Sequence, residues 1–308
     1  MDGTQTTASG LASVEATLRK QLAQGDAALS AATPILQRLV AHPEPGLVND
    51  ETVARVRGML LDLARQLLEP QGLAESALAS RAAELAAVLA ANAALLSHLH
   101  ALAIEGRVVD RLEAEAGIDP VLPPLLAGLI AGEDEVLAGA AMAAMAAQAS
   151  FIEQQRRMAL PLGELPADLF AAALAALRGL EEGDDAATTS VRAYDEGRGR
   201  LALLTRLVMR TGSNAPGALD VERAGVGVFL TALALAAGQE RGVTAMSLAT
   251  DRPARLVLAL RSAGLAPAAL RAQFLHFHPD TSPPAAIADL RAEEAAALLA
   301  SATGRGEG

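Results

Sequence analysis

The residues best suited to chemistry in this chain are two pairs of histidines. His98 and His100 stand two positions apart, as do His276 and His278. Residues at this spacing point in different directions on a helix, so neither pair forms the metal clamp that an i, i+4 pair offers. A histidine on a helical bundle can accept a phosphoryl group, and His98 and His100 are the candidates for such a phosphoacceptor. The sequence around them is rich in leucine, whereas phosphotransfer requires an exposed imidazole.

A run of arginines forms the second group that could do chemistry. Its members are Arg192, Arg198, Arg200, Arg206 and Arg210. Arg206 and Arg210 share a helix face because they are four residues apart. Asp195 and Glu196 lie among the arginines, so one interpretation is a salt-bridged surface. The other is a site for an anion or an acidic partner, and the five arginines are our candidates for it.

The remaining polar signals do not indicate catalysis. Acidic residues cluster at 133–135, 181–185 and 293–294, where helix capping and solvation in turns explain them. We find no P-loop, no Gly-x-Gly-x-x-Gly after a strand, no Gly-x-Ser-x-Gly and no His-Glu-x-x-His. The chain has no cysteine, which removes thiol catalysis, cysteine zinc sites and Fe–S clusters. We therefore predict no catalytic residue, no metal and no cofactor, and a non-enzyme rather than an enzyme.

The elements that would position these residues are helices. Hydrophobic residues make up 52% of the chain but aromatic residues only 2%, and alanine and leucine dominate. Residues that favour strands are sparse, so we expect almost no sheet. The fold class predicted is all-α, as an irregular multi-helix bundle or a stack of antiparallel helical hairpins.

One stretch, residues 134–157, is predicted to be the centre of this assembly. Acidic residues precede it and Arg156 and Arg157 close it, which suits the dipole of a helix. Its middle has no polar face, and a helix that is apolar all round belongs in an interior. We therefore expect a central alanine-rich helix wrapped by the others.

Three parts follow from the breaks in the pattern. Residues 1–9 are predicted to be a disordered tail. Residues 10–158 form an N-terminal helical bundle that includes the central helix. Residues 161–303 form helical hairpins packed against it.

Inside the N-terminal part, glycines and prolines suggest where helices end. We expect Gly25 and Asp26 to separate two helices, the second of which covers residues 34–41. A long helix is expected from Leu73 to about Ile104, with Gly106 as a break or kink. Gly117 is predicted to end the helix after it, as a C′ glycine.

The middle of the chain resembles an all-helical bacterial family whose role is uncharacterised. The resemblance covers Asp119–Leu180, with the run Ala147–Met158 followed by Pro161–Pro166, and the hairpins near Arg261–Pro279. It implies a helical fold and carries over no catalytic residue.

Charge and hydropathy limit the partners. The net charge is −11, and Lys20 is the only lysine, so the chain should repel nucleic acid unless it has a local basic face. The first eight residues lack the features of a signal peptide. The longest apolar run, Val136–Ala147, is shorter than the ~20 residues that span a bilayer. We predict a cytoplasmic protein with no membrane span.

Three hypotheses remain for function. The preferred one is a soluble interaction, scaffold or regulatory protein without catalytic activity, which binds another protein or itself through a groove or apolar patch. The second is a helical bundle that binds a small molecule or is an enzyme, marked by a buried polar cluster such as His98 or His276 beside a charged residue. The third is a histidine phosphorelay module.

Overall fold

The all-α fold class is confirmed. The computed structural model describes residues 3–41, 50–180, 191–192, 194–212, 217–249 and 253–303, and none of them lies in a strand. The helices of the first half are α1 (Gly3–Ala41), α2 (Asp50–Leu68), α3 (Glu75–Leu89), α4 (Ala93–Ala116), α5 (Pro124–Ile130), α6 (Glu135–Arg156) and α7 (Ala167–Leu180). Those of the second half are α9 (Arg200–Thr211), α10 (Val221–Ala237), α11 (Arg241–Ser247), α12 (Ala254–Ser262), α13 (Pro267–Phe277), α14 (Ala285–Ala288) and α15 (Ala292–Thr303). Short 3-10 turns are η1 (Glu69–Gln71), η2 (Leu162–Glu164) and η3 (Glu196–Arg198).

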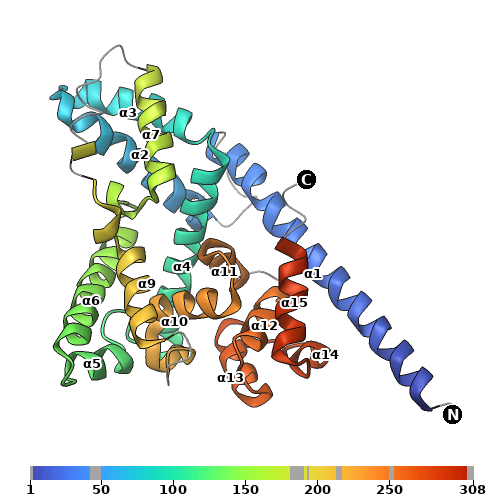
Figure 1. Cartoon of the computed structure of the whole chain (residues 1–308). Helices are drawn as coiled ribbons and strands as arrows, with labels where there is room; N and C mark the ends of the chain where they lie inside the picture. Colours follow the sequence, from blue (N-terminus) through green and yellow to red (C-terminus); the bar gives the residue numbers. More distant parts are fainter. Residues whose placement is uncertain are drawn as a thin grey trace.

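Helix α4 connects the parts of the molecule. At one end α2, α3 and α7 form a group, and at the other α4 meets α10, α11 and α13 (Figure 1). Helices α12 to α15 form a second group beside α1, and α6 packs with α5 and α9 on the opposite side. The long helix α1 contacts α2, α4, α11, α12 and α15, and its N-terminal part extends beyond the rest of the protein (Figure 1).

The core consists mainly of leucine and alanine placed at helical spacing. In α4 the residues Leu95, Leu99 and Leu102 recur every three or four positions and are almost fully buried. Phe151, Phe229 and Phe274 are among the largest fully buried side chains, so the few aromatics are concentrated inside. Arg200 belongs to the same set of fully buried side chains, and it leads to the candidate site described below.

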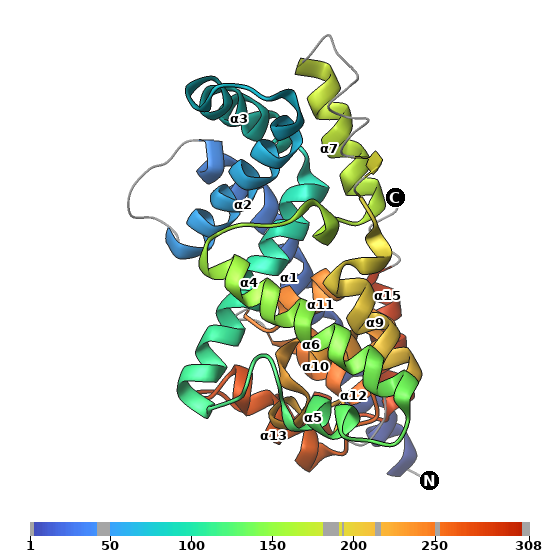
Figure 2. The same ribbon diagram turned by 90° about the vertical axis from the view of Figure 1, so that its left-hand side faces the viewer.

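Helix α6 has nearly the bounds predicted for residues 134–157, but it does not lie at the centre of the molecule. Asp134 caps its start by accepting hydrogen bonds from the N–H groups of Val136 and Leu137. However, the described helices do not wrap α6: it lies at the left-hand side of the molecule in Figure 1 and in front of the other helices in Figure 2. Val136 is 65% exposed and Met142 49% exposed. We call this side the outer face of α6, which comprises Val136, Gly139, Met142, Ala143, Ala146, Ala149 and Ser150.

The prediction of a central place was wrong because alanine is a poor guide to burial. Its small side chain removes little apolar area from water, so an alanine-rich helix can be apolar in sequence and still lie at the surface. The buried side of α6 is marked instead by its bulkier members. These are Gln148, Phe151, Ile152 and Gln155, with Ala141 and Ala144.

Helix α6 also has the length and composition of a helix that could cross a membrane. Two sharply bent pairs, α3 with α4 and α10 with α11, would qualify too if each pair counted as one span. The absence of a membrane span therefore stays a prediction.

Helix α1 replaces the two helices that we predicted. It runs unbroken from Gly3 to Ala41 through Gly25 and Asp26, and Pro34 lies within it. Its first turns include residues 3–9 of the predicted tail, and the disorder of that tail stays a prediction. Gly25 is buried, so packing along the neighbouring helices holds the chain helical at a residue whose intrinsic preference is weak.

The long helix expected from Leu73 to Ile104 is in fact two helices, and the break differs from the one predicted. Asn92 starts α4, with its side chain accepting a hydrogen bond from Leu95 N at 3.0 Å. Gly106 lies inside α4, where an added Cβ would be 2.7 Å from Arg55 Nη1. Glycine at this position therefore permits a close approach and does not break the helix. Gly117 ends α4 with φ 66°, as predicted for a C′ glycine.

Candidate functional site

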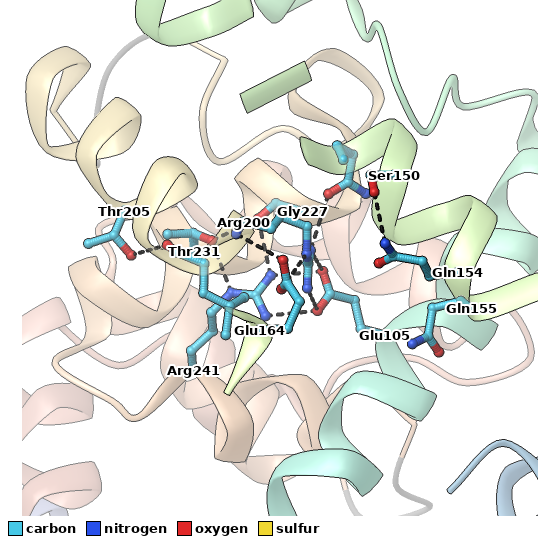
Figure 3. Close-up of polar contacts among 12 residues, drawn as sticks. Glu105, Ser150, Gln154, Gln155, Glu164, Arg200, Thr205, Gly227, Thr231 and Arg241 are labelled. Atoms are coloured by element: carbon cyan, nitrogen blue, oxygen red, sulfur yellow. Dashed lines mark hydrogen bonds and ion pairs between the residues drawn. The ribbon is translucent and has the colours of Figure 1, made fainter. Parts of the chain in front are cut away.

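The most concentrated polar arrangement in the interior surrounds Glu105 of α4. Glu105 and Arg200 are both 0% exposed, and Arg241 approaches from the other side. Arg200 donates from Nη1 and Nη2 to the two carboxylate oxygens, at 2.8 and 3.1 Å. Arg241 does the same at 2.8 Å for each bond, so two guanidinium groups hold one carboxylate (Figure 3). We call Glu105, Gln148, Glu164, Arg200 and Arg241 the Glu105 network.

The start of α9 is built to place Arg200 in this network. The N–H of Arg200 donates to Glu164 Oε1 at 2.9 Å, which ties the first turn of α9 to η2. The preceding residue, Gly199, lies against the carbonyl of Gly163 so closely that a Cβ there would overlap the oxygen. Glycine is therefore required for the approach that brings Arg200 inward.

The sharp turn between α10 and α11 places Arg241. The two helices are bent by 114°, and Gly238 ends α10 in the left-handed region with φ 61°. Arg241 then begins α11, and its Nε donates to Thr231 Oγ1 at 3.0 Å. Thr231 itself donates to the carbonyl of Gly227 at 2.8 Å. Arg241 is thus fixed from the side of α10 as well as by Glu105.

The inner face of α6 completes the network. Gln148 Oε1 accepts from Arg200 Nη1 at 3.1 Å, and the guanidinium of Arg200 lies 3.5 Å from the ring centroid of Phe151. Gly227 allows this arrangement, because a Cβ there would lie 2.8 Å from Gln148 Oε1. Helices α4, α6, α9, α10 and α11 therefore meet around a single carboxylate.

The charged groups of the Glu105 network are paired with one another. Burial alone would raise the pKa of Glu105, but the charges and hydrogen bonds of Arg200 and Arg241 outweigh it and hold that pKa well below its ordinary value. Burial alone would lower the pKa of Arg200, and Glu105 and then Glu164 raise it. Glu164 Oε2 lies 3.6 Å from Arg200 Nε. Two carboxylates and two guanidinium groups thus neutralise one another, as buried charges require.

His98 borders the network as a neutral group. Its Nε2 donates to the backbone carbonyl of Glu164 at 3.2 Å. Burial lowers the pKa of His98 to about 4, and the nearby charges of Arg241 and Arg200 act in the same direction. Burial also lowers the pKa of His100. Both imidazoles are half-buried, so neither offers the exposed ring that we required of a phosphoacceptor, and the phosphorelay hypothesis gains no support.

The arginine run does not form a single surface. Arg192, Arg198, Arg206 and Arg210 are exposed, and Arg206 donates to the carbonyl of Gly197. Arg200 is fully buried, so its place among the candidates for a surface anion site was wrong. The sequence does distinguish Arg200 from the other four arginines. It lies on the same helix face as Leu204, Leu207 and Val208, which are buried in α9.

Sequence reasoning also missed Glu105 and Arg241. Glu105 lies on an apolar side of α4, three residues after Leu102 and four before Val109, all of them buried. A charged residue in an apolar stripe is a signal of a buried ion pair, because an unpaired charge would be costly there. For Arg241 we find no comparable signal in the sequence.

A surface cleft lies beside the other half of α4. Its volume is about 670 Å³, and we call it the α4 cleft. Ile104, Val108 and Phe277 line its apolar part, and Arg107, Arg111 and Glu115 line its charged part. At one rim the buried Arg55 pairs with Asp110 at 2.5 Å and with Glu51 at 2.8 Å.

The histidines near the end of α13 have separate surroundings. His276 lies 3.5 Å from a carboxylate oxygen of Glu222. His278 stacks on Phe274, with ring centroids 4.9 Å apart, and lines the α4 cleft. The two rings therefore have different neighbours.

No three histidine, aspartate or glutamate side chains among the described residues are grouped as a metal site would need. That the protein uses no cofactor stays a prediction. Comparison with protein-family models, with curated proteins and with solved structures found no match to this chain.

Proposed function

We propose that this chain is a helical interaction protein that binds another protein chain through the outer face of α6 and carries out no catalysis itself. The observation that carries the proposal is the exposure of apolar side chains on a helix of the fold. Val136 is 65% exposed and Met142 49% exposed, on a side that no helix of the described part of the chain covers. An apolar face of this kind commonly marks a site of protein contact.

The chemistry of the interior supports a structural role for the strongest polar site. In the Glu105 network the charged groups face one another, and Arg200 and Glu105 have no exposed surface. A catalytic group needs access to a substrate, whereas these groups are enclosed. The network therefore serves to hold α4, α6, α9 and α11 in place, and with them the outer face of α6.

A crosslinking experiment tests the proposal directly. A photo-crosslinking amino acid is placed at Met142, and separately at Leu235 of α10, which is 43% exposed. In a lysate of the native cell, we expect a protein adduct from position 142 that is absent from position 235. Equal labelling from both positions, or none from position 142, contradicts the proposal.

The α4 cleft supports a second candidate, which is the binding of a small molecule. Its volume of about 670 Å³ lies in the range of ligand sites, and it combines an apolar wall with arginine and glutamate side chains. These groups fit a ligand with both a carboxylate and an amine. Free amino acids would then raise the melting temperature of the wild type but not of Arg111→Met, and no shift with any of them argues against this candidate.

A further inference from the structure

We propose that the partner of the outer face of α6 is the same face of a second copy, with the two helices antiparallel. The inference rests on the proposed function, because it names the occupant of that same face. It is carried by the spacing of the exposed residues, by the symmetry of that spacing and by the charges at the two ends of the helix.

The exposed residues of α6 follow a coiled-coil spacing. Along the middle of the outer face the steps alternate between three and four residues, which is the spacing of a and d positions. The residues at these positions, which we call the seam, are Val136, Gly139, Ala143, Ala146 and Ser150 of the outer face, followed by Glu153, and all of them are exposed. Such a spacing occurs where one straight helix lies along another, and no helix among the described residues lies along these positions.

The spacing of the seam positions is the same in both directions, although the residues at its two ends, Val136 and Glu153, differ. Its centre lies between Ala144 and Met145, so a second copy running the opposite way aligns a positions with d positions throughout. Gly139 then faces Ser150 of the second copy, and Ala143 faces Ala146. The small side chains let the two helix axes approach to about 8 Å, the short end of the range for packed helices. Met142 lies beside the seam and would cover its edge.

The charges at the ends favour the antiparallel arrangement. Glu133 and Glu135 are exposed at the start of α6, and Arg156 and Arg157 are exposed at its end. In an antiparallel pair each acidic end lies beside the basic end of the other copy, whereas a parallel pair would place like charges together. This charge complementarity occurs twice in the pair because of the symmetry.

The ion pairs that these arginines already make do not oppose the arrangement. Arg156 lies 3.4 Å from Glu113, and Arg157 lies 2.5 Å from Glu153. All four side chains are at least 43% exposed, and exposed ion pairs stabilise a protein very little. The arginines can therefore turn to a second copy at small cost.

A protein surface fits this face better than a lipid surface does. Helices that lie on membranes carry bulky apolar residues on one side and basic residues beside them. The outer face of α6 has one valine and one methionine among small side chains, and its first end is acidic. The small residues suit close packing of two backbones, so we favour a second copy.

Sedimentation measures whether the pair forms. The chain of 31.4 kDa is followed by analytical ultracentrifugation over a wide range of concentrations. We expect a concentration-dependent dimer in the wild type. The variant Ala143→Glu with Ala146→Glu should weaken the dimer at least about 100-fold, because the new charges would be buried together in the seam. Ala175→Glu, at an exposed alanine of α7, should leave it unchanged.

Crosslinking then tests the direction of the helices. The chain has no cysteine, so a single added cysteine is the only thiol that the crosslinker can modify. A Cβ at Gly139 meets no atom within 4 Å, so cysteine fits at this position. A mixture of Gly139→Cys and Ser150→Cys should be joined by a short thiol crosslinker. Neither variant alone should react, because equal positions lie about 16 Å apart along the axis in the antiparallel pair. Crosslinking of Gly139→Cys to itself overturns the arrangement.

The outcomes separate this inference from the proposed function. A monomer at every concentration overturns the self-pairing. If Met142 of that monomer still gives adducts with another protein, the proposed function survives, and without adducts both fail. Binding to vesicles of anionic phospholipid that is lost in the Ala143→Glu, Ala146→Glu variant would overturn the inference in favour of a membrane-binding face.

Discussion

The interior around Glu105 and the outer face of α6 have polarities opposite to what their places in the molecule suggest. The interior site holds two carboxylates and two guanidinium groups, of which Glu105 and Arg200 are fully buried. The outer face presents valine, methionine and alanine to the solvent. Gln148 and Phe151 of α6 contact Arg200, so the buried side of this helix includes polar contacts while its outer face includes exposed apolar residues.

This difference shows that pairing, and not polarity alone, decides where a residue lies. A buried charge is tolerated when an opposite charge neutralises it, and Glu105 meets two. An exposed apolar residue has no such requirement and is available to a partner. Substitutions in the interior should therefore change stability, and substitutions on the outer face should change association.

The largest expected effect is that of Glu105→Gln. The amide keeps the shape of the side chain but leaves Arg200 and Arg241 without their main counter-charge. We expect a loss of about 3–5 kcal/mol in the free energy of unfolding, measured by urea denaturation. Glu113→Gln is the control in the same helix, because Glu113 is exposed and its pair with Arg156 should contribute under about 1 kcal/mol. Equal effects would remove the distinction between the two regions.

The second largest expected effect on stability is that of replacing Arg200, compared with replacing the nearby Arg198. Arg200→Met should destabilise the protein by about 3 kcal/mol, since the carboxylates lose one partner while Arg241 remains. Arg198→Met, at an exposed position two residues earlier, should change the free energy by less than about 0.5 kcal/mol. A similar loss in both variants would mean that Arg200 is not held in the interior.

The contributions of His98 and Glu105 to the free energy of unfolding should appear in different pH ranges. The pKa of His98 is lowered from 6.5 to about 4 in the folded protein, so the unfolded chain binds the proton more readily between these values. Stability should therefore fall by about 2 kcal/mol as the pH decreases from 6.5 to 4, allowing for the partial exposure of the ring. The lowered pKa of Glu105 adds a further loss only below about pH 4.5, where the unfolded carboxylate begins to bind protons.

The variant His98→Gln identifies the source of the upper part of this curve. Glutamine can still donate to the carbonyl of Glu164 but does not titrate. Unfolding measured at several pH values should show a smaller fall in stability between pH 6.5 and 4.5, and the part that remains includes the contribution of His100, whose pKa burial also lowers. If the slope is unchanged, a different group is responsible.

The smallest expected effect on stability is on the outer face. Ala143→Glu and Ala146→Glu lie at exposed helical positions, where glutamate is a good helix former. At concentrations where the wild type is monomeric, the free energy of unfolding should change by less than about 0.5 kcal/mol. A loss of several kcal/mol would show that this face is part of the folded core.

The sequence predicted local features well and long-range placement poorly. Asp134 and Gly117 mark helix ends because capping depends on residues within one turn. The convergence of Arg200 and Arg241 on Glu105 joins residues 95 and 136 positions apart, and it depends on the order of the helices in space. The interior site therefore could not be read from the pattern alone.

The errors at α1 and α6 have a common physical cause. Gly25 disfavours a helix by itself, but packing along other helices overrides that preference. Alanine is compatible with either burial or exposure, so the run in α6 did not determine its place. In both cases the outcome was determined by tertiary packing, which cannot be derived from the local sequence pattern.

The stacking of Tyr194 on Phe170 has a practical consequence for spectroscopy. The rings are 3.9 Å apart and nearly parallel, and the phenol donates to the carbonyl of Leu165 at 2.8 Å. Since the chain has no tryptophan and only this tyrosine, its tyrosine emission comes from one side chain. That ring sits where the segment before α9 meets α7, so the native protein carries an unlabelled optical reporter for detachment of that segment.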